Sequence, residues 1–272
     1  MIVEMKRFFD RIKHLQMSEK TVAMLQQTFI HVPGIGLVRE RRLWDAGIRT
    51  WHDYLASGAD LSSNTSGVEQ MREHLAQSLQ AYHEAAWAYF DKRLPSDHKW
   101  RAFGDFQDRT LYLDIETTGL TSDDSITIIG MYNGRETKTF VLGQNLREAV
   151  EEINRYPILV TYNGACFDIP VIQRHFSTAC RNHIHIDLRY PLRRLGYSGG
   201  LKGIERAMGI ARSEATRDLG GWDAVRLWQA YLGGSQEALD LLVVYNAEDV
   251  RHLKPLMEFV YQNCYSALQP AS

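Results

Sequence analysis

Two acidic side chains inside an apolar run constrain this chain more than any other feature of its sequence. The run L-Y-L-D-I-E-T-T-G-L, residues 111–120, contains Asp114 and Glu116. Its β-favouring residues, and the polar Thr-Thr-Gly that follows them, predict a strand over 111–116. Side chains alternate along a strand, so both carboxylates lie on one face, roughly 6–7 Å apart. Burying two like charges so close is unfavourable unless they share a cation, which points to a divalent metal.

The rest of the chain has the composition of a globular protein with a sizeable core. Of its 272 residues 44% are hydrophobic and 24% are charged, and the formal net charge is −2. No apolar run reaches the roughly 20 residues of a membrane span, and the N-terminal segment lacks the apolar core of a signal peptide. The three cysteines suggest neither a disulfide framework nor a metal site. These features predict a cytoplasmic protein without a membrane partner.

The distribution of helix and strand signals predicts two domains, 1–100 and 101–272. Helices are expected in the first at 1–15, 21–29 and 67–92. Strands are expected in the second at 111–115, 125–132, 138–142, 158–162 and 183–188, with helices at 146–154, at 168–176 and from there to the end. The dipeptide Asn133-Gly134 predicts a hairpin after the second strand. Strands that can pair antiparallel, followed by strands separated by helices, favour an α/β fold with a mixed sheet.

Two further segments carry acidic residues at positions suited to a shared site. T-Y-N-G-A-C-F-D-I-P places Asp168 at the start of a helix that follows the fourth expected strand. In Y-N-A-E-D-V, Tyr245 and Asp249 are four residues apart and share one face of a helix. Taken singly, each has a simpler interpretation: Asp168 stabilises a helix N-terminus, and Tyr245 and Asp249 form a surface pair. Their combination with the first strand changes the interpretation.

The order and spacing of D-I-E-T, N-x-x-x-F-D and Y-x-x-x-D resemble the motifs of the DnaQ-like (DEDD) 3′–5′ exonuclease superfamily. The tyrosine makes the chain similar to the DEDDy branch, because the other branch would have histidine at the position of Val244. The resemblance implies an RNase H-like fold, a five-stranded mixed sheet flanked by helices. The segments 199–210 (G-G-L-K-G-I-E-R-A-M-G-I) and 221–228 (G-W-D-A-V-R-L-W) resemble more closely the bacterial RNase H-like proteins of the YprB family.

The resemblance implies a metal-dependent 3′–5′ exonuclease that acts on the 3′ end of DNA or RNA with two ions. Hard oxygen ligands suit Mg²⁺ or Mn²⁺, and the absence of Cys/His clusters argues against zinc. By analogy with the family, Asp114 bridges both ions, while Glu116 and Asp249 complete the site that activates water. Asp168 holds the second ion. Tyr245 orients the attacking water, because a free phenol has a pKa near ~10 and is a weak base at neutral pH.

The leading helical part contains a segment, 29–55, that resembles a helix-hairpin-helix motif. Its P-G-I-G turn is expected to expose the backbone N–H groups of Gly34 and Gly36 at the start of a helix, which suits a phosphate. The basic residues that follow on this helix, and that could add contacts independent of base sequence, are Arg39, Arg41 and Arg42. The alternative is that the hairpin packs against the catalytic part and touches no nucleic acid.

Three other residues are candidates for contact with nucleic acid: Thr117, Asn163 and Lys202. For Lys202, a solvated lysine at a helix start is the simpler interpretation. Two alternatives to the exonuclease stay open, a non-catalytic nucleic-acid-binding protein and a structure-selective endonuclease on the same fold. The complete carboxylate set favours an enzyme. DNA and RNA both stay open as substrates, and the sequence names no protein partner.

Several residues near these motifs have structural interpretations. Asp187 is expected to cap the helix after the fifth strand rather than to bind metal. His183 and His185 are expected at the surface or on the substrate side. Trp222 and Trp228 are expected to lie together in the core.

Overall fold

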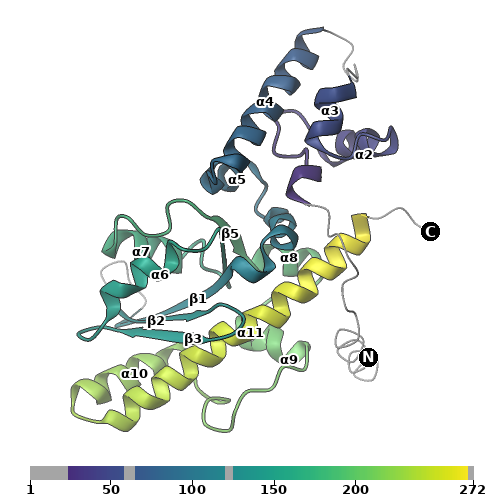
Figure 1. Ribbon diagram of the computed structural model, residues 1–272. Helices are drawn as coiled ribbons and strands as arrows, with labels where there is room; N and C mark the ends of the chain where they lie inside the picture. Colours follow the sequence, from purple (N-terminus) through teal and green to yellow (C-terminus); the bar gives the residue numbers. More distant parts are fainter. Residues whose placement is uncertain (1–23, 58–64, 120–124, 269–272) are drawn as a thin grey trace.

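The structure is a computed structural model that describes residues 24–57, 65–119 and 125–268 (Figure 1). The helix expected at 1–15 and the first part of that expected at 21–29 lie outside the described residues. Within the described part of 21–29, the 3₁₀ helix η1 (Leu25–Gln27) is present. No helix in these three ranges combines the length and the hydrophobicity that crossing a membrane requires.

One mixed sheet forms the centre of the molecule. Its strands are β1 (Thr110–Thr117), β2 (Ile126–Tyr132), β3 (Thr137–Val141), β4 (Ile158–Thr161) and β5 (Ile184–Asp187). They lie in the order β3-β2-β1-β4-β5. The hairpin pairs β1–β2 and β2–β3 are antiparallel, whereas β1–β4 and β4–β5 are parallel. Each expected strand is present, so the predicted α/β fold with a five-stranded mixed sheet is confirmed.

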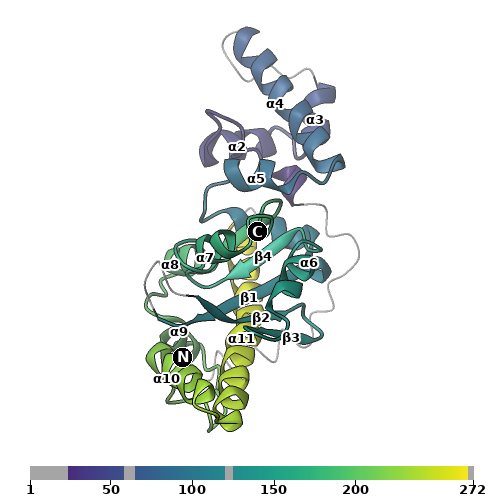
Figure 2. The ribbon, with the colours of Figure 1, turned by 90° about the vertical axis from the view of Figure 1, so that its left-hand side faces the viewer.

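Helices cover both faces of this sheet. The side chains of Leu111, Leu113 and Ile115 pack on one face with α6 (Ala149–Ile153) and α7 (Asp168–His175). Tyr112, on the opposite face, belongs to the buried cluster that includes residues of α11 (Gln236–Leu268), which crosses the sheet (Figure 2). Asp114 and Glu116 have the parity of Tyr112 and therefore face α11.

Among the described residues, four further helices belong to the second half of the chain. They are η4 (Leu146–Glu148), α8 (Arg189–Arg194), α9 (Leu201–Ala207) and α10 (Gly221–Leu232). Trp228 of α10 is buried in a cluster with α11, but Trp222 is 63% exposed, so the expected core pair is wrong for Trp222. Six residues of an α-helix make about 1.7 turns, which leaves the two side chains roughly 120° apart around the axis.

The leading part of the chain is helical, with a break that the sequence did not indicate. Its elements are α2 (Leu37–Asp45), α3 (Trp51–Ser57), α4 (Thr65–His83), α5 (Trp87–Arg93), η2 (Lys99–Asp105) and η3 (Gln107–Arg109). The single helix expected at 67–92 is wrong, because α4 ends before Ala85, which has a left-handed φ of 53°. The N–H of Ala86 then bonds the carbonyl of Ala81, as in a Schellman cap. The break lets Phe90 stack on Trp51 in the core.

The leading helices close the β5 edge of the sheet. Asp91 of α5 accepts the backbone N–H of His185 at 2.8 Å and pairs with Lys99 at 2.6 Å. Asn182 bonds the backbone of both Ala85 and Ala88. An edge strand presents unpaired backbone groups, and this contact satisfies one of them. A single buried cluster runs from the leading helices into the sheet, and a division near residue 100 remains a prediction.

The packing of the leading helices on β5 also explains why the predicted exposure of its histidines is wrong. His183 was expected at the surface or on the substrate side, but it is buried, and its Nδ1 lies 2.5 Å from the carbonyl oxygen of Tyr156. His185 is half-buried beneath α5, with Nε2 at 2.8 Å from the hydroxyl of Thr161. Helix α5, which covers these residues, comes from a distant part of the sequence.

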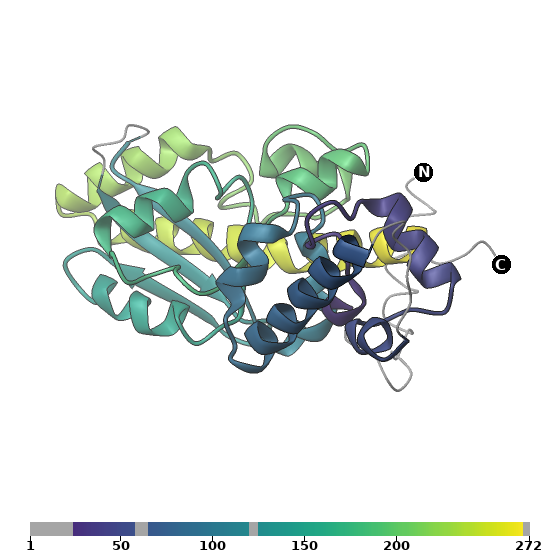
Figure 3. The same cartoon turned by 90° about the horizontal axis from the view of Figure 1, so that it is seen from above.

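A buried ion pair joins α2 to η2. Nη1 of Arg101 donates to both carboxylate oxygens of Glu40 at 2.8 Å, and the two side chains are 0% and 1% exposed. The same carboxylate accepts the backbone N–H of Phe29 at 2.7 Å. At the far end, Arg41 of α2 donates to the carbonyl of Leu268 at 2.7 Å, where α11 (yellow in Figure 3) reaches the leading helices. These contacts fix α2 to η2 and to the last turn of α11.

Replacing Arg101 by methionine is expected to lower the free energy of unfolding by about 3–5 kcal/mol, because it leaves the Glu40 carboxylate buried without its cation. Urea unfolding at pH 7 measures this. The double variant Glu40→Gln/Arg101→Met is expected to lose less, since a neutral amide oxygen still accepts the N–H of Phe29. Equal losses in the single and double variants would contradict this account of the pair.

Candidate active site

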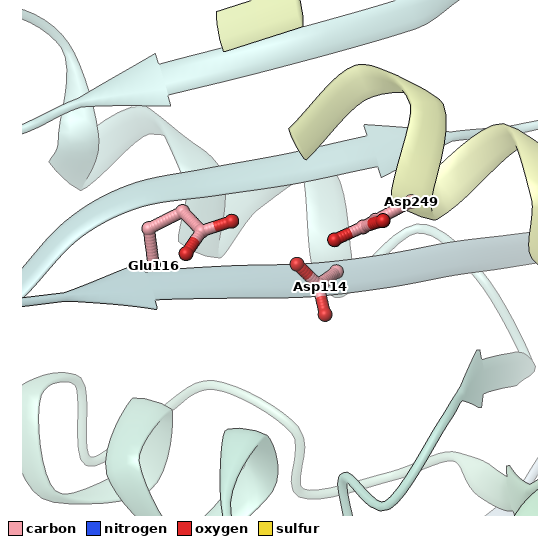
Figure 4. Close-up of side chains that lie close together, drawn as sticks. All are labelled: Asp114, Glu116 and Asp249. Atoms are coloured by element: carbon pink, nitrogen blue, oxygen red, sulfur yellow. The ribbon is translucent and has the colours of Figure 1, made fainter. Parts of the chain in front are cut away.

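Strand β1 and helix α11 bring three carboxylates together. Asp114 and Glu116 project from β1 towards Asp249 on α11 (Figure 4). One carboxylate oxygen from each lies within 4.8 Å of the other two. Glu116 is 8% and Asp249 is 6% exposed. Buried carboxylate oxygens at this spacing could hold a divalent metal ion.

The electrostatics of the group favour a bound cation. Burial raises the pKa of Asp114 well above its usual value, and the carboxylates of Asp168, Asp249 and Glu116 raise it further. The pKa of Glu116 is also raised well above its usual value, first by burial and then by Asp249. Burial raises the pKa of Asp249 to about 6, although Arg212 opposes the shift. A divalent ion would stabilise the charged form of all these groups.

Asp168 approaches the group from the first turn of α7. Its Oδ1 accepts the backbone N–H of Ile115 at 3.2 Å, and burial raises its pKa to about 7. It is outside the group of three, but its charge contributes to the raised pKa of Asp114, so the two lie near each other. The structure therefore gathers all four predicted carboxylates around the carboxyl end of β1.

The loop that delivers Asp168 is held by Asp187. Asp187 accepts the N–H of Asn163 at 2.8 Å and that of Ala165 at 3.1 Å. It also accepts the N–H of Arg189 at 3.0 Å, in the first turn of α8, as expected for a cap. Asn163 has a φ of 65°, a left-handed conformation that asparagine tolerates better than most residues. Asp187 therefore caps α8, as predicted, and also holds the loop that positions Asp168.

Tyr245 lies one turn before Asp249 on α11, and it is buried. Burial, then the charge of Asp249, raises the pKa of its hydroxyl above the usual value. The hydroxyl therefore stays protonated at neutral pH. It can donate or accept a hydrogen bond, but it is unsuited to act as a general base.

The contact between α11 and β1 depends on two residues that sequence reasoning missed. Nδ2 of Asn246 donates to Oδ2 of Asp114 at 2.9 Å, and the asparagine is fully buried. Gly130 of β2 is the register partner of Asp114, and a Cβ built on it would lie 1.8 Å from Oδ1 of Asn246. A glycine inside a strand often marks a close approach. The glycine inside the expected strand 125–132 (S-I-T-I-I-G-M-Y) was therefore a sign in the sequence that another element packs closely there.

Basic residues border the acidic group, and the sequence analysis identified only Lys202 among them. Arg212 donates to Glu205 through Nε and Nη2, both at 2.6 Å, and Nη2 also bonds Asp249. Nζ of Lys202 is buried, 4.6 Å from the centroid of the Tyr245 ring. Lys202 was a candidate, but its interpretation as a solvated lysine is wrong. Arg212 lies in a loop after α9, where no periodic pattern could indicate it.

The other predicted nucleic-acid contacts near the sheet have protein partners. Thr117 is buried and donates to the carbonyl oxygen of Gly119. Oδ1 of Asn163 accepts from Nη1 of Arg189 at 2.6 Å. Both lie at carboxyl ends of strands, Thr117 on β1 and Asn163 just after β4.

The predicted contact residues of the helix-hairpin-helix-like segment lie on and before α2, which is separate from β1 and from the part of α11 that packs on the sheet (Figures 1 and 2). Gly34, with a φ of 80°, and Gly36 are exposed before α2 begins. Arg39 donates to the carbonyl of Gly34 at 3.0 Å, and Arg41 pairs with Asp45 at 3.2 Å. Arg42 is exposed. A contact of this segment with nucleic acid remains a prediction.

Comparison with known proteins places this site in a family. The model of the RNase_H superfamily matches residues 111–261, more than half of the chain, so the chain belongs to the RNase_H superfamily. The matched region runs from β1 into α11 and includes the four carboxylates and Tyr245.

Two solved structures are similar to parts of the chain. A family B DNA polymerase from the hyperthermophilic archaeon Pyrobaculum calidifontis is 15% identical with a TM-score of 0.47, over 56% of this chain and 24% of the polymerase chain. The Nibbler EXO domain of Aedes aegypti is 9% identical with a TM-score of 0.41, over 62% of this chain and 90% of that one. The chain thus spans about a quarter of the polymerase. No curated protein matches the sequence.

The raised pKa values predict how the metal-free protein responds to pH. Asp168 titrates at about 7 in the folded protein but near ~3.9 in an unfolded chain. Between these values the folded state holds a proton that the unfolded state has lost, so this carboxyl destabilises the fold increasingly as pH rises. Asp168→Asn is therefore expected to gain stability relative to the parent protein from pH 4.5 to 7, by at most about 1.4 kcal/mol per pH unit.

Urea unfolding of both proteins in EDTA at several pH values measures this difference, and the subtraction removes the contribution of the buried histidines. Adding Mn²⁺ at pH 7 is expected to stabilise the parent protein more than Asp168→Asn. A stability difference that does not change with pH would show that Asp168 is not held in this environment.

Gly130→Ala is expected to weaken Mn²⁺ binding about tenfold, because the new methyl group displaces Asn246 from Asp114, and loss of a partner that orients a ligand typically has this effect. Calorimetric titration with Mn²⁺ measures it. The matched control is Gly221→Ala, where an added Cβ meets no atom within 4 Å. Equal Mn²⁺ affinity in the two folded variants would contradict the role given to Gly130.

Proposed function

We propose that this protein is a metal-dependent 3′–5′ exonuclease that hydrolyses phosphodiester bonds of nucleic acid. The observation that carries the proposal is the convergence of Asp114, Glu116 and Asp249 from β1 and α11 into one largely buried group. This group lies within the region that matches the RNase_H superfamily.

The four carboxylates together would bind two Mg²⁺ or Mn²⁺ ions. Asp114, central on β1, would bind both ions, with Glu116 and Asp249 completing the first site and Asp168 the second. The donor set fits these ions, because all four side chains offer hard oxygen ligands. When bound, such ions lower the pKa of a bound water and stabilise negative charge on the phosphate.

Tyr245 orients the attacking water, as the tyrosine of the DEDDy branch does. Its hydroxyl keeps its proton at neutral pH and lies on the same face of α11 as Asp249. A hydroxyl in this state can fix the direction of a water through a hydrogen bond, but it cannot take a proton from that water. Lys202, Thr117 and Asn163 would contact the nucleic-acid strand near the site. Gly34 and Gly36 would add a distant contact with its sugar-phosphate backbone.

The test uses single-stranded DNA and RNA, each as a linear 5′-labelled strand and as a circle, with Mn²⁺. An exonuclease of the proposed polarity shortens the linear strand stepwise from its 3′ end, and a 3′-terminal phosphorothioate slows it. It leaves the circles intact. Cuts in a circle would favour an endonuclease, and the absence of any product would favour a non-catalytic binding protein.

Two variants are expected to separate metal binding from turnover. Asp114→Asn abolishes nucleotide release and leaves the melting temperature of the metal-free protein unchanged or raised, because it removes a crowded charge. Tyr245→Phe keeps Mn²⁺ affinity and slows release about 10²-fold. Asp108→Asn, at an exposed position in η3, is the control and is expected to act like the parent protein. Nucleotide release by Asp114→Asn at the parent rate would refute the metal site.

A further inference from the structure

A charged assembly outside the carboxylate group holds Arg212 in one orientation. The side chains of Arg212 and Glu205 are 5% and 1% exposed, and they share two hydrogen bonds of 2.6 Å. His252 of α11 supports the same carboxylate, with Nδ1 at 2.9 Å from Oε1 of Glu205. A planar guanidinium bound through two donors has little rotational freedom. The direction of its remaining donor is therefore fixed.

Two buried cationic donors beside the site have no protein acceptor. Among the residues that the structure describes, Nη1 of Arg212 and Nζ of Lys202 are buried without a hydrogen-bond partner. Both cations lie against the ring of Tyr245, Nζ at 4.6 Å and the guanidinium carbon at 5.5 Å from its centroid. A buried donor without a partner is unfavourable, more so when it carries charge. An anionic ligand would satisfy both.

We infer that Arg212 and Lys202 form a subsite that binds a phosphate of the nucleic-acid strand, with Glu205 and His252 as positioning residues. The inference rests on the proposed function for the identity of the anion. Arg212 also bonds Asp249, so the subsite adjoins the three carboxylates. A phosphate held there would lie beside the carboxylate group, and Nη1 of Arg212 and Nζ of Lys202 would offer donors to its non-bridging oxygens.

A role as counter-charges for the carboxylates does not account for both cations. Arg212 already pairs with Glu205 and Asp249, but Nζ of Lys202 has no hydrogen bond to any described carboxylate. The two like charges also repel each other. Burial lowers the pKa of Lys202, and the charge of Arg212 lowers it further. A neutral side chain at this position would stabilise the protein, whereas a lysine there suits the binding of an anion.

The first test measures the binding of 20-nucleotide oligothymidylate and oligouridylate by fluorescence anisotropy in EDTA, at several KCl concentrations. Lys202→Met is expected to weaken binding about tenfold and to reduce the slope of log Kd against log[KCl] by about 0.7, the share of one contact with a single strand. Its melting temperature is expected to be unchanged or raised. Parent-like affinity and slope would overturn the inference, as would a lowered melting temperature with unchanged binding.

The second test isolates Arg212. Because Arg212→Gln alone leaves the buried Glu205 carboxylate without its arginine and could prevent folding, the comparison is Glu205→Gln against Glu205→Gln/Arg212→Gln. The single variant retains the arginine charge and is expected to keep the slope of log Kd against log[KCl]. In the double variant this slope is expected to be smaller by about 0.7. Equal slopes would overturn the role of Arg212. The control is Arg226→Gln, whose side chain is 79% exposed on α10, and parent-like binding is expected.

These outcomes are independent of the exonuclease assay. If the parent protein releases nucleotides while the Lys202 and Arg212 variants bind oligonucleotides normally, the subsite is refuted and the proposed function stands. If those variants bind more weakly with a smaller salt slope, the subsite is supported even where the parent protein releases no nucleotide.

Discussion

The crowding of negative charge between β1 and α11 is the constraint to which the neighbouring structure is adapted. Burial raises the pKa of each carboxyl in the group, and repulsion by neighbouring carboxylates raises the pKa of Asp114 and Glu116 further. Asn246 relieves part of this by donating to Asp114, and it can do so because Gly130 leaves space for it. Arg212 relieves another part by bonding Asp249. The site therefore depends on α11 lying close to the sheet.

That closeness is maintained by contacts at two places along α11. The helix, 33 residues long, packs on the sheet over its middle part and contacts the leading helices at its end. The Glu40–Arg101 pair fixes α2 to η2, and Arg41 fixes α2 to the last turn of α11. The leading helices thus brace the helix that carries Tyr245 and Asp249. They are therefore part of the scaffold of the site.

Local periodicity made part of the site predictable, and the resemblance of the combined motifs to a known superfamily joined these parts and Asp168 into one site. Strand alternation placed Asp114 and Glu116 on one face, and the spacing of four placed Tyr245 beside Asp249 on a helix. Contacts decided by tertiary packing were not predictable in this way. Arg212 lies in an irregular loop, and the left-handed turn at Ala85 falls in an alanine-rich segment that favours helix. There the burial of Phe90 against Trp51 outweighed the local preference.

The pairing of acidic and basic groups restricts the ligands that suit this site. Carboxylates alone would suit a cation, but Lys202 and Nη1 of Arg212 add buried donors that a cation cannot satisfy. A neutral substrate would leave these donors without a charged acceptor. A phosphate accompanied by divalent ions satisfies both sets, since its oxygens accept from the basic residues while the ions bind the carboxylates. The electrostatics of the residues and membership of the RNase_H superfamily are therefore both consistent with the proposed hydrolysis of phosphodiesters.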